Sequence, residues 1–443
     1  MWNKVFDFVR KHQLLSRGGL HVVALSGGAD SVALLLILRQ LGYRIEAAHC
    51  NFHLRGEESN RDEAFVKSLC ERLGIPIHLI HFDTREYAVL HQVSIEMAAR
   101  DLRYGYFRQL CQDIGAETVC VAHHRDDAVE TFLMNLLRGS GIHGLTGIRP
   151  RNGQIVRPLL CLSRQDIEDY LHSIGQDYVT DSTNLEDDVL RNKIRLRVLP
   201  LLKDINPQAK ENIDRTANYL LEAEKIFNIS IVRQLEGTVV ADASSQMQTV
   251  AVSNLLQLPS PETFLHEWLA PYGFNSLQTT QISAHLIGLS GKEFLSSTHV
   301  LVTDRDRLVL EPIREAMKPL KMPETGVYAY ADNMRIKLEI SDSVSISKSD
   351  NSITLDAAKV KFPLTVRPVQ TGDSFCPFGM EGHKLVSDFM TDRKMTLLEK
   401  RRQLVVTDCG GEIVWLVGLR TDNRYKVEKQ TSSILRITVA KTL

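Results

Sequence analysis

The chain has 443 residues, of which 43% are hydrophobic and 24% charged, which is enough for several buried cores and predicts about two to four domains. The net charge of −1 gives no global reason to expect a nucleic-acid partner, and seven cysteines without a CxxC pair argue against disulfides and a Cys-rich metal site. The longest apolar run near the N-terminus, Val32 to Leu38, is too short to cross a membrane, and the opening stretch MWNKVFDFVRKHQ is too charged for a signal peptide. We therefore expect a cytoplasmic protein without a membrane span.

From residue 20 to about residue 175, short apolar runs alternate with stretches of helical spacing. This pattern predicts an α/β fold with a parallel sheet covered by helices. One helix is predicted over Asp62 to Leu73, and another between a cap at Ser163 and a stop at Gly175. The predicted strands are Val22 to Leu25, Arg44 to His49, Pro76 to Phe82, Thr118 to Ala122 and Ile155 to Leu159.

After Pro207 the apolar residues keep a helical spacing, as at Ile213, Ala217 and Leu220, and we see no strand alternation until about residue 336. The sequence therefore predicts a helical middle domain over residues 207–318, after an α/β domain over residues 1–206. A proline-rich linker follows, and residues 325–443 are predicted to form a small β-rich α+β domain, with strands around 336–340, 404–406, 413–418 and 434–439.

The strongest motif is VVALSGGADS, in which a buried strand runs directly into a Gly-Gly turn and a helix. Glycines allow close backbone approach, and the unpaired N–H groups of a helix N-terminus attract an anion. The motif is not a Walker A loop, because no GxxxxGK followed by Ser or Thr occurs in the chain. A Gly-Gly turn also opens helices in many α/β folds, but here it predicts a phosphate-binding loop made of Ser26, Gly27, Gly28, Ala29, Asp30 and Ser31.

Other polar residues follow predicted strands. His49 ends the second strand, the run from His123 to Asp127 follows the fourth, and Arg157 lies within the fifth. In an open parallel sheet such positions gather at the carboxyl edge, where ligands bind. Asp127 and Glu130 share a helix face, as do Arg100 and Arg103 on the preceding helix. Paired carboxylates can bind Mg²⁺ or an ammonium group, although such a face is often only solvated.

Two stretches, residues 131–165 and 189–203, contain five basic residues each and no acid. They are either solvated basic faces or contacts for RNA phosphates.

These motifs resemble known families. SGGxDS after the first strand resembles the PP-loop of ATP pyrophosphatases, which cleave ATP to AMP and pyrophosphate. IEMAARDLRYGYF (95–107), VAHHRDDAVETFLMNLLRGSG (121–141), RPLL (157–160), DSTN (181–184) and RNKIR (191–195) resemble the N-terminal domain of the tRNA(Ile)-lysidine synthetase family. VRPVQTGD (366–373), GHKLVSDFM (382–390) and WLVGLRTDNRYKV (415–427) resemble its C-terminal domain. One departure is Asn51-Phe52-His53-Leu54-Arg55, because that family usually has His-Gly-Leu-Arg after the second strand.

The resemblance implies a ligase that joins L-lysine to C2 of the wobble cytidine in the CAU anticodon of tRNA(Ile), through an adenylated cytidine. It implies that ATP is bound by residues 26–31 and His49, that Asp30 holds Mg²⁺, and that Asp30, Asp127 and Glu130 are catalytic. The last two are candidates for binding the lysine ammonium, with Glu130 as a candidate base. It further implies tRNA binding by the middle and C-terminal domains and substrate or tRNA contacts from Arg100, Arg103, His123, Arg191, Asn192 and Arg195.

Two alternatives remain open. A PP-loop tRNA thiolase shares the loop but typically needs paired cysteines, and a non-catalytic nucleotide-binding or RNA-binding relative would not need the intact Ser26, Asp30, Asp127 and Glu130. The sequence does not reveal the oligomeric state, and a homodimer is compatible with it.

Overall fold

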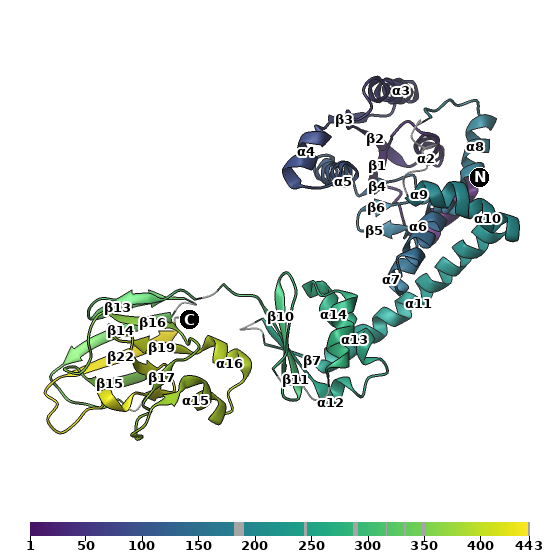
Figure 1. Ribbon diagram of the computed structural model, residues 1–443. Helices are drawn as coiled ribbons and strands as arrows, with labels where there is room; N and C mark the ends of the chain where they lie inside the picture. The colour runs from purple at the N-terminus through teal and green to yellow at the C-terminus, as the bar shows by residue number, and fades with distance from the viewer. Residues whose placement is uncertain are drawn as a thin grey trace. The chain divides into compact units, whose positions relative to one another are not determined.

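The computed structural model describes residues 1–180, 190–242, 246–286, 291–315, 317–331, 334–347, 349 and 351–441. Residue contacts divide the chain into two compact units, Met1–Ile229 and Ser230–Leu443. Figure 1 shows the elements of each unit. The DSTN motif at 181–184 lies outside the described residues.

The first unit is built on a six-stranded sheet with the order β3-β2-β1-β4-β6-β5. All its pairs are parallel except β5 with β6. The order reverses between β1 and β4, so a crevice for a ligand is expected at their carboxyl ends. The strands are β1 (Leu20–Ala24), β2 (Arg44–Asn51), β3 (Ile77–His81), β4 (Thr118–Cys120), β5 (Arg151–Asn152) and β6 (Ile155–Val156).

Four of the five predicted strands are confirmed. The fifth, predicted over Ile155 to Leu159, is wrong beyond Val156, because residues Pro158–Cys161 form a 3₁₀ turn. Proline has no N–H to donate to a strand ladder, and it is favoured at the start of a helical turn.

Helices cover both faces of the sheet, as the positions of α2 and α5 in Figure 1 show. Val23 of β1 packs with α1, α2, α3 and α8, whereas its neighbour Val22 packs with α5. The prediction for α8 is confirmed, because the Ser163 hydroxyl accepts a hydrogen bond from the Asp166 N–H and Gly175 has a φ of +63°. These helices are α1 (Trp2–Lys11), α2 (Ala29–Gln40), α3 (Glu57–Leu73), α4 (Thr84–His91), α5 (Ile95–Ile114) and α8 (Arg164–Ser173).

A long helix, α11 (Ala209–Thr238), begins in the first unit. Its Ala217 is buried against Val129 and Phe132 of α6, and Lys210 Nζ lies 2.5 Å from Asp126 Oδ1. The first unit therefore ends at Ile229, after the predicted domain boundary at residue 206, because the apolar face of α11 packs on this unit. The remaining elements here are α6 (Arg125–Leu137), α7 (Ile142–Leu145), α9 (Leu190–Lys193), a π-helical turn (Ile194–Val198) and α10 (Leu199–Ile205).

The second unit begins with helices and a five-stranded antiparallel sheet of order β7-β8-β11-β10-β9. The predicted helical character is confirmed by α11, α12 (Val252–Leu255), α13 (Pro261–Leu269) and α14 (Ser276–Ala284), but the sequence analysis missed this sheet. Leu301 packs with the helices while Val300 and Val302 pack with Leu398, so β10 is apolar on both faces and does not alternate. The strands are β7 (Val239–Asp242), β8 (Met247–Ala251), β9 (Glu293–Leu295), β10 (His299–Asp304) and β11 (Arg307–Pro312).

The rest of the second unit is β-rich, as predicted. Two sheets, β12-β16-β19-β20-β21 and β13-β14-β22-β15, share a core that includes Leu338, Val366 and Trp415. The strands are β12 (Leu320–Met322), β13 (Gly326–Tyr330), β14 (Met334–Ser341), β15 (Ser352–Asp356), β16 (Leu364–Pro368), β19 (Leu404–Thr407), β20 (Ile413–Leu416), β21 (Arg420–Thr421) and β22 (Ile434–Lys441). The short pair β17 (Ser374–Phe375) and β18 (Lys384–Leu385) precedes α15 (Val386–Asp392) and α16 (Leu397–Arg402).

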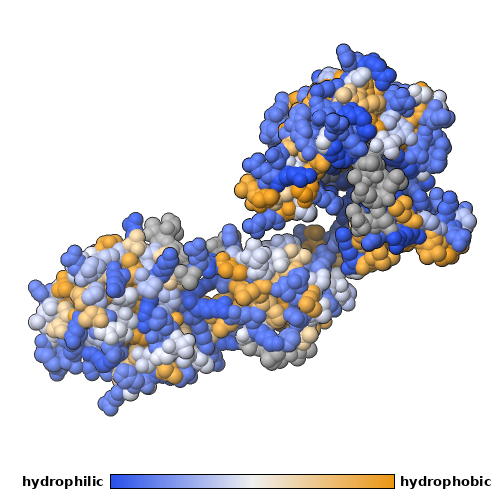
Figure 2. Space-filling view, turned by 45° about the horizontal axis from the view of Figure 1, so that its top comes forward, coloured by the Kyte–Doolittle hydropathy of each residue, from blue (hydrophilic) through white to orange (hydrophobic). Residues whose placement is uncertain are grey.

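Within the described ranges, no helix has both the length and the apolar character needed to cross a membrane. On the face shown in Figure 2, hydrophobic residues form separate patches between hydrophilic ones.

Candidate functional site

The loop between β1 and α2 has the conformation of an anion-binding turn. Gly27 has a φ of +94°, and a Cβ at this position would lie 3.3 Å from Val66, so only glycine fits without strain. The Ser31 hydroxyl closes the loop by accepting from the N–H groups of Ser26 and Gly27, each at 3.2 Å, and by donating to the Gly28 carbonyl at 2.9 Å. The first N–H groups of α2 have no partner within the helix and remain available to an anion.

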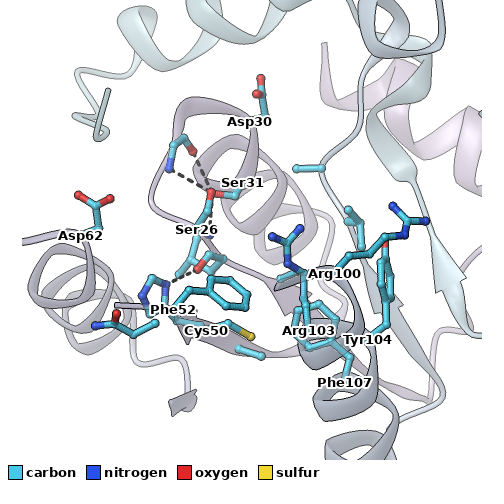
Figure 3. Close-up of a pocket in the computed structure, with 18 of the residues that line it drawn as sticks. Ser26, Asp30, Ser31, Cys50, Phe52, Asp62, Arg100, Arg103, Tyr104 and Phe107 are labelled. Atoms are coloured by element: carbon cyan, nitrogen blue, oxygen red, sulfur yellow. Dashed lines mark hydrogen bonds between the residues drawn. The ribbon is translucent and has the colours of Figure 1, made fainter. Parts of the chain in front are cut away.

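A pocket of about 600 Å³ lies beside this loop, at the carboxyl ends of β1, β2 and β4. Figure 3 shows Ser26, Ser31 and Asp30 on one side of it and Arg100, Arg103 and Tyr104 on another. The predicted residues that line the pocket are Ser26, Gly28, Asp30, Ser31, His49, Arg100, Arg103, His123, Asp127 and Arg191. The predicted residues Gly27, Ala29, Glu130, Asn192 and Arg195 are not among its lining residues.

Several lining residues were missed by the sequence analysis. Asn51 and Arg55 lie at and after the end of β2, and the strand-end argument that singled out His49 could have found them. Asp62 and Glu96 lie on α3 and near the start of α5, where no comparable sequence signal marks them.

Asp30 has one carboxylate oxygen that is free for a ligand. Its Oδ2 accepts a hydrogen bond from Arg164 Nη1 at 2.5 Å. Its Oδ1 is buried, lies 3.8 Å from His124 Nε2, and has no hydrogen-bond partner in the part of the chain that the structure describes. Burial raises the pKa of this carboxyl. A buried carboxylate oxygen without a donor is a candidate cation ligand.

The backbone fixes the tautomer of the His49 ring, and burial favours its neutral form. Its Nδ1 lies 2.8 Å from the Leu25 carbonyl oxygen, and because that oxygen only accepts, Nδ1 must carry the proton. Burial lowers the pKa of this imidazole, which disfavours a second proton. His49 therefore presents Nε2 as an acceptor, next to the phosphate-binding loop.

Asp127 combines a structural bond with access to the pocket. Its Oδ2 accepts from the His124 N–H at 3.0 Å, and its own N–H donates to His124 Nδ1 at 3.3 Å, which forms a capping box at the start of α6. The side chain also lines the pocket, so a cationic group there would lie beside a carboxylate that is already oriented.

Glu130 does not have the environment that its spacing from Asp127 predicts. The side chain is only 1% exposed, and its two oxygens accept from Arg195 Nε at 2.7 Å and from Arg195 Nη2 at 3.0 Å. Arg191 Nε lies 3.2 Å from the same carboxylate. The helical spacing gives the face of α6 but not the arginines that contact Glu130, which are Arg191 on α9 and Arg195 on the π-helical turn after it. The role of Glu130 toward lysine stays a prediction.

The segment that departs from the resembling family forms part of the wall of the pocket. Phe52 lines the pocket and stacks on Phe82 with a ring-centre distance of 5.6 Å, while the Arg103 guanidinium carbon lies 5.3 Å from the Phe52 ring centre. This cation–π contact holds Arg103 against the pocket wall. His53, where that family has glycine, has a φ of +51°, a conformation that glycine adopts readily.

The acid-free basic stretch over residues 131–165 is partly exposed, and most of its arginines also bond to other parts of the first unit. Arg149 bonds to Glu224, Arg151 to the carbonyls of Gln13 and Leu14, Arg157 to His123 and Arg164 to Asp30. Four of its five arginines thus have partners that are distant in the sequence. Contact of either stretch with RNA stays a prediction.

Among the described residues, no group of three or more His, Cys, Asp or Glu side chains is arranged to hold a metal ion.

Comparison with family models gives three matches along the chain. Residues 7–202 match the PP-loop domain, residues 244–313 match the TilS substrate binding domain, and residues 364–438 match the TilS substrate C-terminal domain. In chain order, the three matched segments cover most of the α/β unit, the region from β8 to β11, and the region from β16 to β22.

Curated relatives match almost end to end. The chain is 46% identical to a tRNA(Ile)-lysidine synthase of Bacteroides thetaiotaomicron over 98% of both chains. It is 47% identical to that of Parabacteroides distasonis over 97% of both chains. Among solved structures, it is similar to the U34-tRNA thiolase NcsA from Methanococcus maripaludis at 18% identity, covering 50% of this chain and 77% of that one with a TM-score of 0.42. A likeness this distant carries no functional argument.

Proposed function

This chain belongs to the tRNA(Ile)-lysidine synthase family, and from that premise we propose that it joins L-lysine to C2 of the wobble cytidine in the CAU anticodon of tRNA(Ile), converting ATP to AMP and pyrophosphate. The observation that carries the proposal is a pocket that brings together the PP-loop, Asp30, Asp127, and Arg100 and Arg103 of α5. The reaction requires a site for the phosphates of ATP, a site for the lysine ammonium and a surface that binds the RNA.

The first step must activate the base. The cytosine C2 carbonyl is amide-like and a poor electrophile, so its oxygen first attacks the α-phosphate of ATP and pyrophosphate leaves. The backbone N–H groups of the PP-loop and the Ser26 hydroxyl are positioned to hold the departing pyrophosphate. Ser31 contributes by fixing the loop conformation, since its hydroxyl is already bonded within the loop.

Mg²⁺ fits the residues present. Across the residues that the structure describes, the buried Asp30 Oδ1 has no hydrogen-bond donor, and a carboxylate oxygen is the kind of ligand that Mg²⁺ takes. When bound, the ion neutralises charge that develops on the phosphates. Asp30 is the side chain of this chain that would hold it.

The second step needs a neutral amine. The lysine ε-amino group has a reference pKa of about 10.4, so only about one molecule in a thousand is neutral at pH 7. We propose that Asp127 binds the incoming ammonium and takes one proton from it. The neutral lysine amine then forms the C2–N bond while the C2–O bond of the adenylated cytidine breaks and AMP leaves. Glu130 holds Arg191 and Arg195 in place, and Arg191 reaches the pocket wall.

The reaction is tested by its products. When the protein is incubated with ATP, Mg²⁺, labelled L-lysine and a tRNA(Ile) transcript with a CAU anticodon, we expect label in the tRNA, together with AMP and pyrophosphate. A transcript with the wobble cytidine replaced by uridine is the matched control and should stay unlabelled. ADP as the main nucleotide product would contradict the proposal.

We also propose that the C-terminal part of the second unit binds tRNA through its unpaired cations. The sequence groups Lys384, Arg393, Lys394, Arg401 and Arg402 there. Lys384, Arg401 and Arg402 form ion pairs with Asp392, Glu293 and Glu311, respectively. Within the described ranges, Arg393 and Lys394 have no carboxylate within ion-pair distance, so they remain available for RNA phosphates.

The double variant Arg393→Ala/Lys394→Ala should therefore bind tRNA with a weaker salt dependence. Loss of two phosphate contacts is expected to reduce the slope of log K against log salt by about 1.5. The matched control is Lys337→Ala/Lys384→Ala, since both lysines already pair with carboxylates. Binding measured over a series of salt concentrations gives both slopes, and equal slopes for the two variants would count against the assignment.

A further inference from the structure

Arg157 is a buried cation that the mechanism above does not use. The side chain is 9% exposed, and no carboxylate of the described residues lies within ion-pair distance of it. Burial lowers the pKa of its guanidinium. Burying an arginine without a counter-ion costs free energy, so its contacts must compensate in another way.

The guanidinium is fixed by neutral acceptors on two sides. Its Nε donates to His123 Nδ1 at 3.1 Å, and its Nη1 donates to the Arg149 carbonyl oxygen at 2.7 Å. The Arg157 backbone N–H also donates to the Pro150 carbonyl at 2.9 Å, which anchors the residue at the end of β6. The position of the Nε–H group is therefore restricted by the backbone and by the Tyr104 side chain, which also hydrogen-bonds to this guanidinium.

This contact decides where the proton of His123 lies. A guanidinium has only donors, so Nδ1 of His123 must be an unprotonated acceptor and a neutral ring must carry its proton on Nε2. The groups that face the ring act in opposite directions: burial and the charges of Arg157, Arg191 and His124 lower the pKa of His123, while Asp127 raises it, with a net value of about 4.

We propose that Arg157 is a positioning residue that keeps His123 as the neutral tautomer with Nε2–H, so that His123 presents a hydrogen-bond donor to the pocket. His49 is held in the opposite tautomer by the Leu25 carbonyl and presents an acceptor. The two histidines at the ends of β2 and β4 thus give the pocket one acceptor and one donor. Resting on the proposed function, the donor serves a phosphoryl oxygen of ATP or of the adenylated cytidine.

The tautomer can be measured without any substrate. In protein labelled with ¹⁵N in the histidine rings, with the His123 signals assigned from a His123→Gln variant, long-range ¹H–¹⁵N spectra should show the Nε2–H form between pH 6 and 8. A proton on Nδ1 of His123 in the unsubstituted protein would overturn the inference, whatever the enzyme assays give.

Arg157→Met should release the ring. We expect a mixture of tautomers and a higher pKa for His123, because the cation that lowers it is gone. Pyrophosphate release should fall about 3- to 10-fold in kcat with little change in the KM for ATP, and Arg157→Lys should restore part of the tautomer preference. The matched control is Arg151→Met, because among the described residues Arg151 donates only to the backbone carbonyls of Gln13, Leu14 and Gly153. An unchanged His123 spectrum in Arg157→Met would refute the positioning role.

Discussion

Replacement of Asp30 by asparagine is expected to lower tRNA-dependent pyrophosphate release by about 10²- to 10³-fold, the typical effect of removing one preorganised electrostatic group. The amide keeps the shape of the side chain but loses the charge, and the oxygen that has no donor in the structure would no longer attract a cation. The defect should appear already in the first step, so no adenylated tRNA should accumulate. Release of radiolabelled pyrophosphate measures this step directly.

A matched control separates the metal from the ion pair with Arg164. Arg164 bonds to Asp30 through Nη1 and to Glu168 through Nε, at 2.5 and 2.6 Å. Glu168→Gln therefore weakens the ion pair that orients Arg164 but leaves Asp30 unchanged. This variant should keep most of the pyrophosphate-release activity. If both variants lose activity equally, Asp30 acts by orienting Arg164. Wild-type pyrophosphate release by Asp30→Asn would exclude both roles.

Local patterns predict local structure well in this chain. The Ser163 cap and the Gly175 stop define α8 because both act within one helical turn, and the Gly-Gly turn of the PP-loop depends on a backbone conformation that the sequence itself encodes. The sheet of the second unit could not be found in the same way. The apolar residues of β10 are buried on both faces by segments far away in the chain, so the period of two that marks a strand is absent.

The candidate site shows the same limit. His49, His123 and the PP-loop line one pocket, as their positions after predicted strands indicate. The carboxyl ends of parallel strands lie along one edge of the sheet, so residues that follow the strands meet there. The partners of charged residues are not predictable from local spacing. Glu224 lies 75 residues from Arg149, and Glu130 lies 65 residues from Arg195, yet each pair forms a direct bond. A stretch without acids therefore does not show that its basic residues lack partners in the fold.

Glu130 is the residue for which sequence and structure predict different chemistry. Its helical spacing predicts a second carboxylate beside Asp127 that could bind lysine. In the structure, both carboxylate oxygens of Glu130 accept hydrogen bonds from Arg195. The largest influence on the pKa of Arg195 is its hydrogen bond to Glu130, which raises it, and the charges of Asp127 and Asp30 act in the same direction. The charge of Arg195 therefore interacts with the carboxylates of the site as well as with Glu130, and we propose that Glu130 acts through it.

Glu130→Gln is then expected to reduce lysine transfer about 10- to 100-fold, the usual effect of losing one charge-assisted bond of about 1.5 to 3 kcal/mol. If Glu130 acts through Arg195, the double variant Glu130→Gln/Arg195→Gln should be no worse than the more impaired single variant, because both changes remove the same interaction. The KM for lysine should stay within about 3-fold of wild type, and added lysine should not restore turnover. If instead Glu130 binds lysine itself, the two substitutions should have additive effects, the KM for lysine should rise by the full factor, and saturating lysine should restore the rate. Steady-state lysine transfer by the three variants separates these outcomes, and melting temperatures confirm that each variant is folded. Additive losses together with a raised KM for lysine would show that Glu130 binds lysine directly.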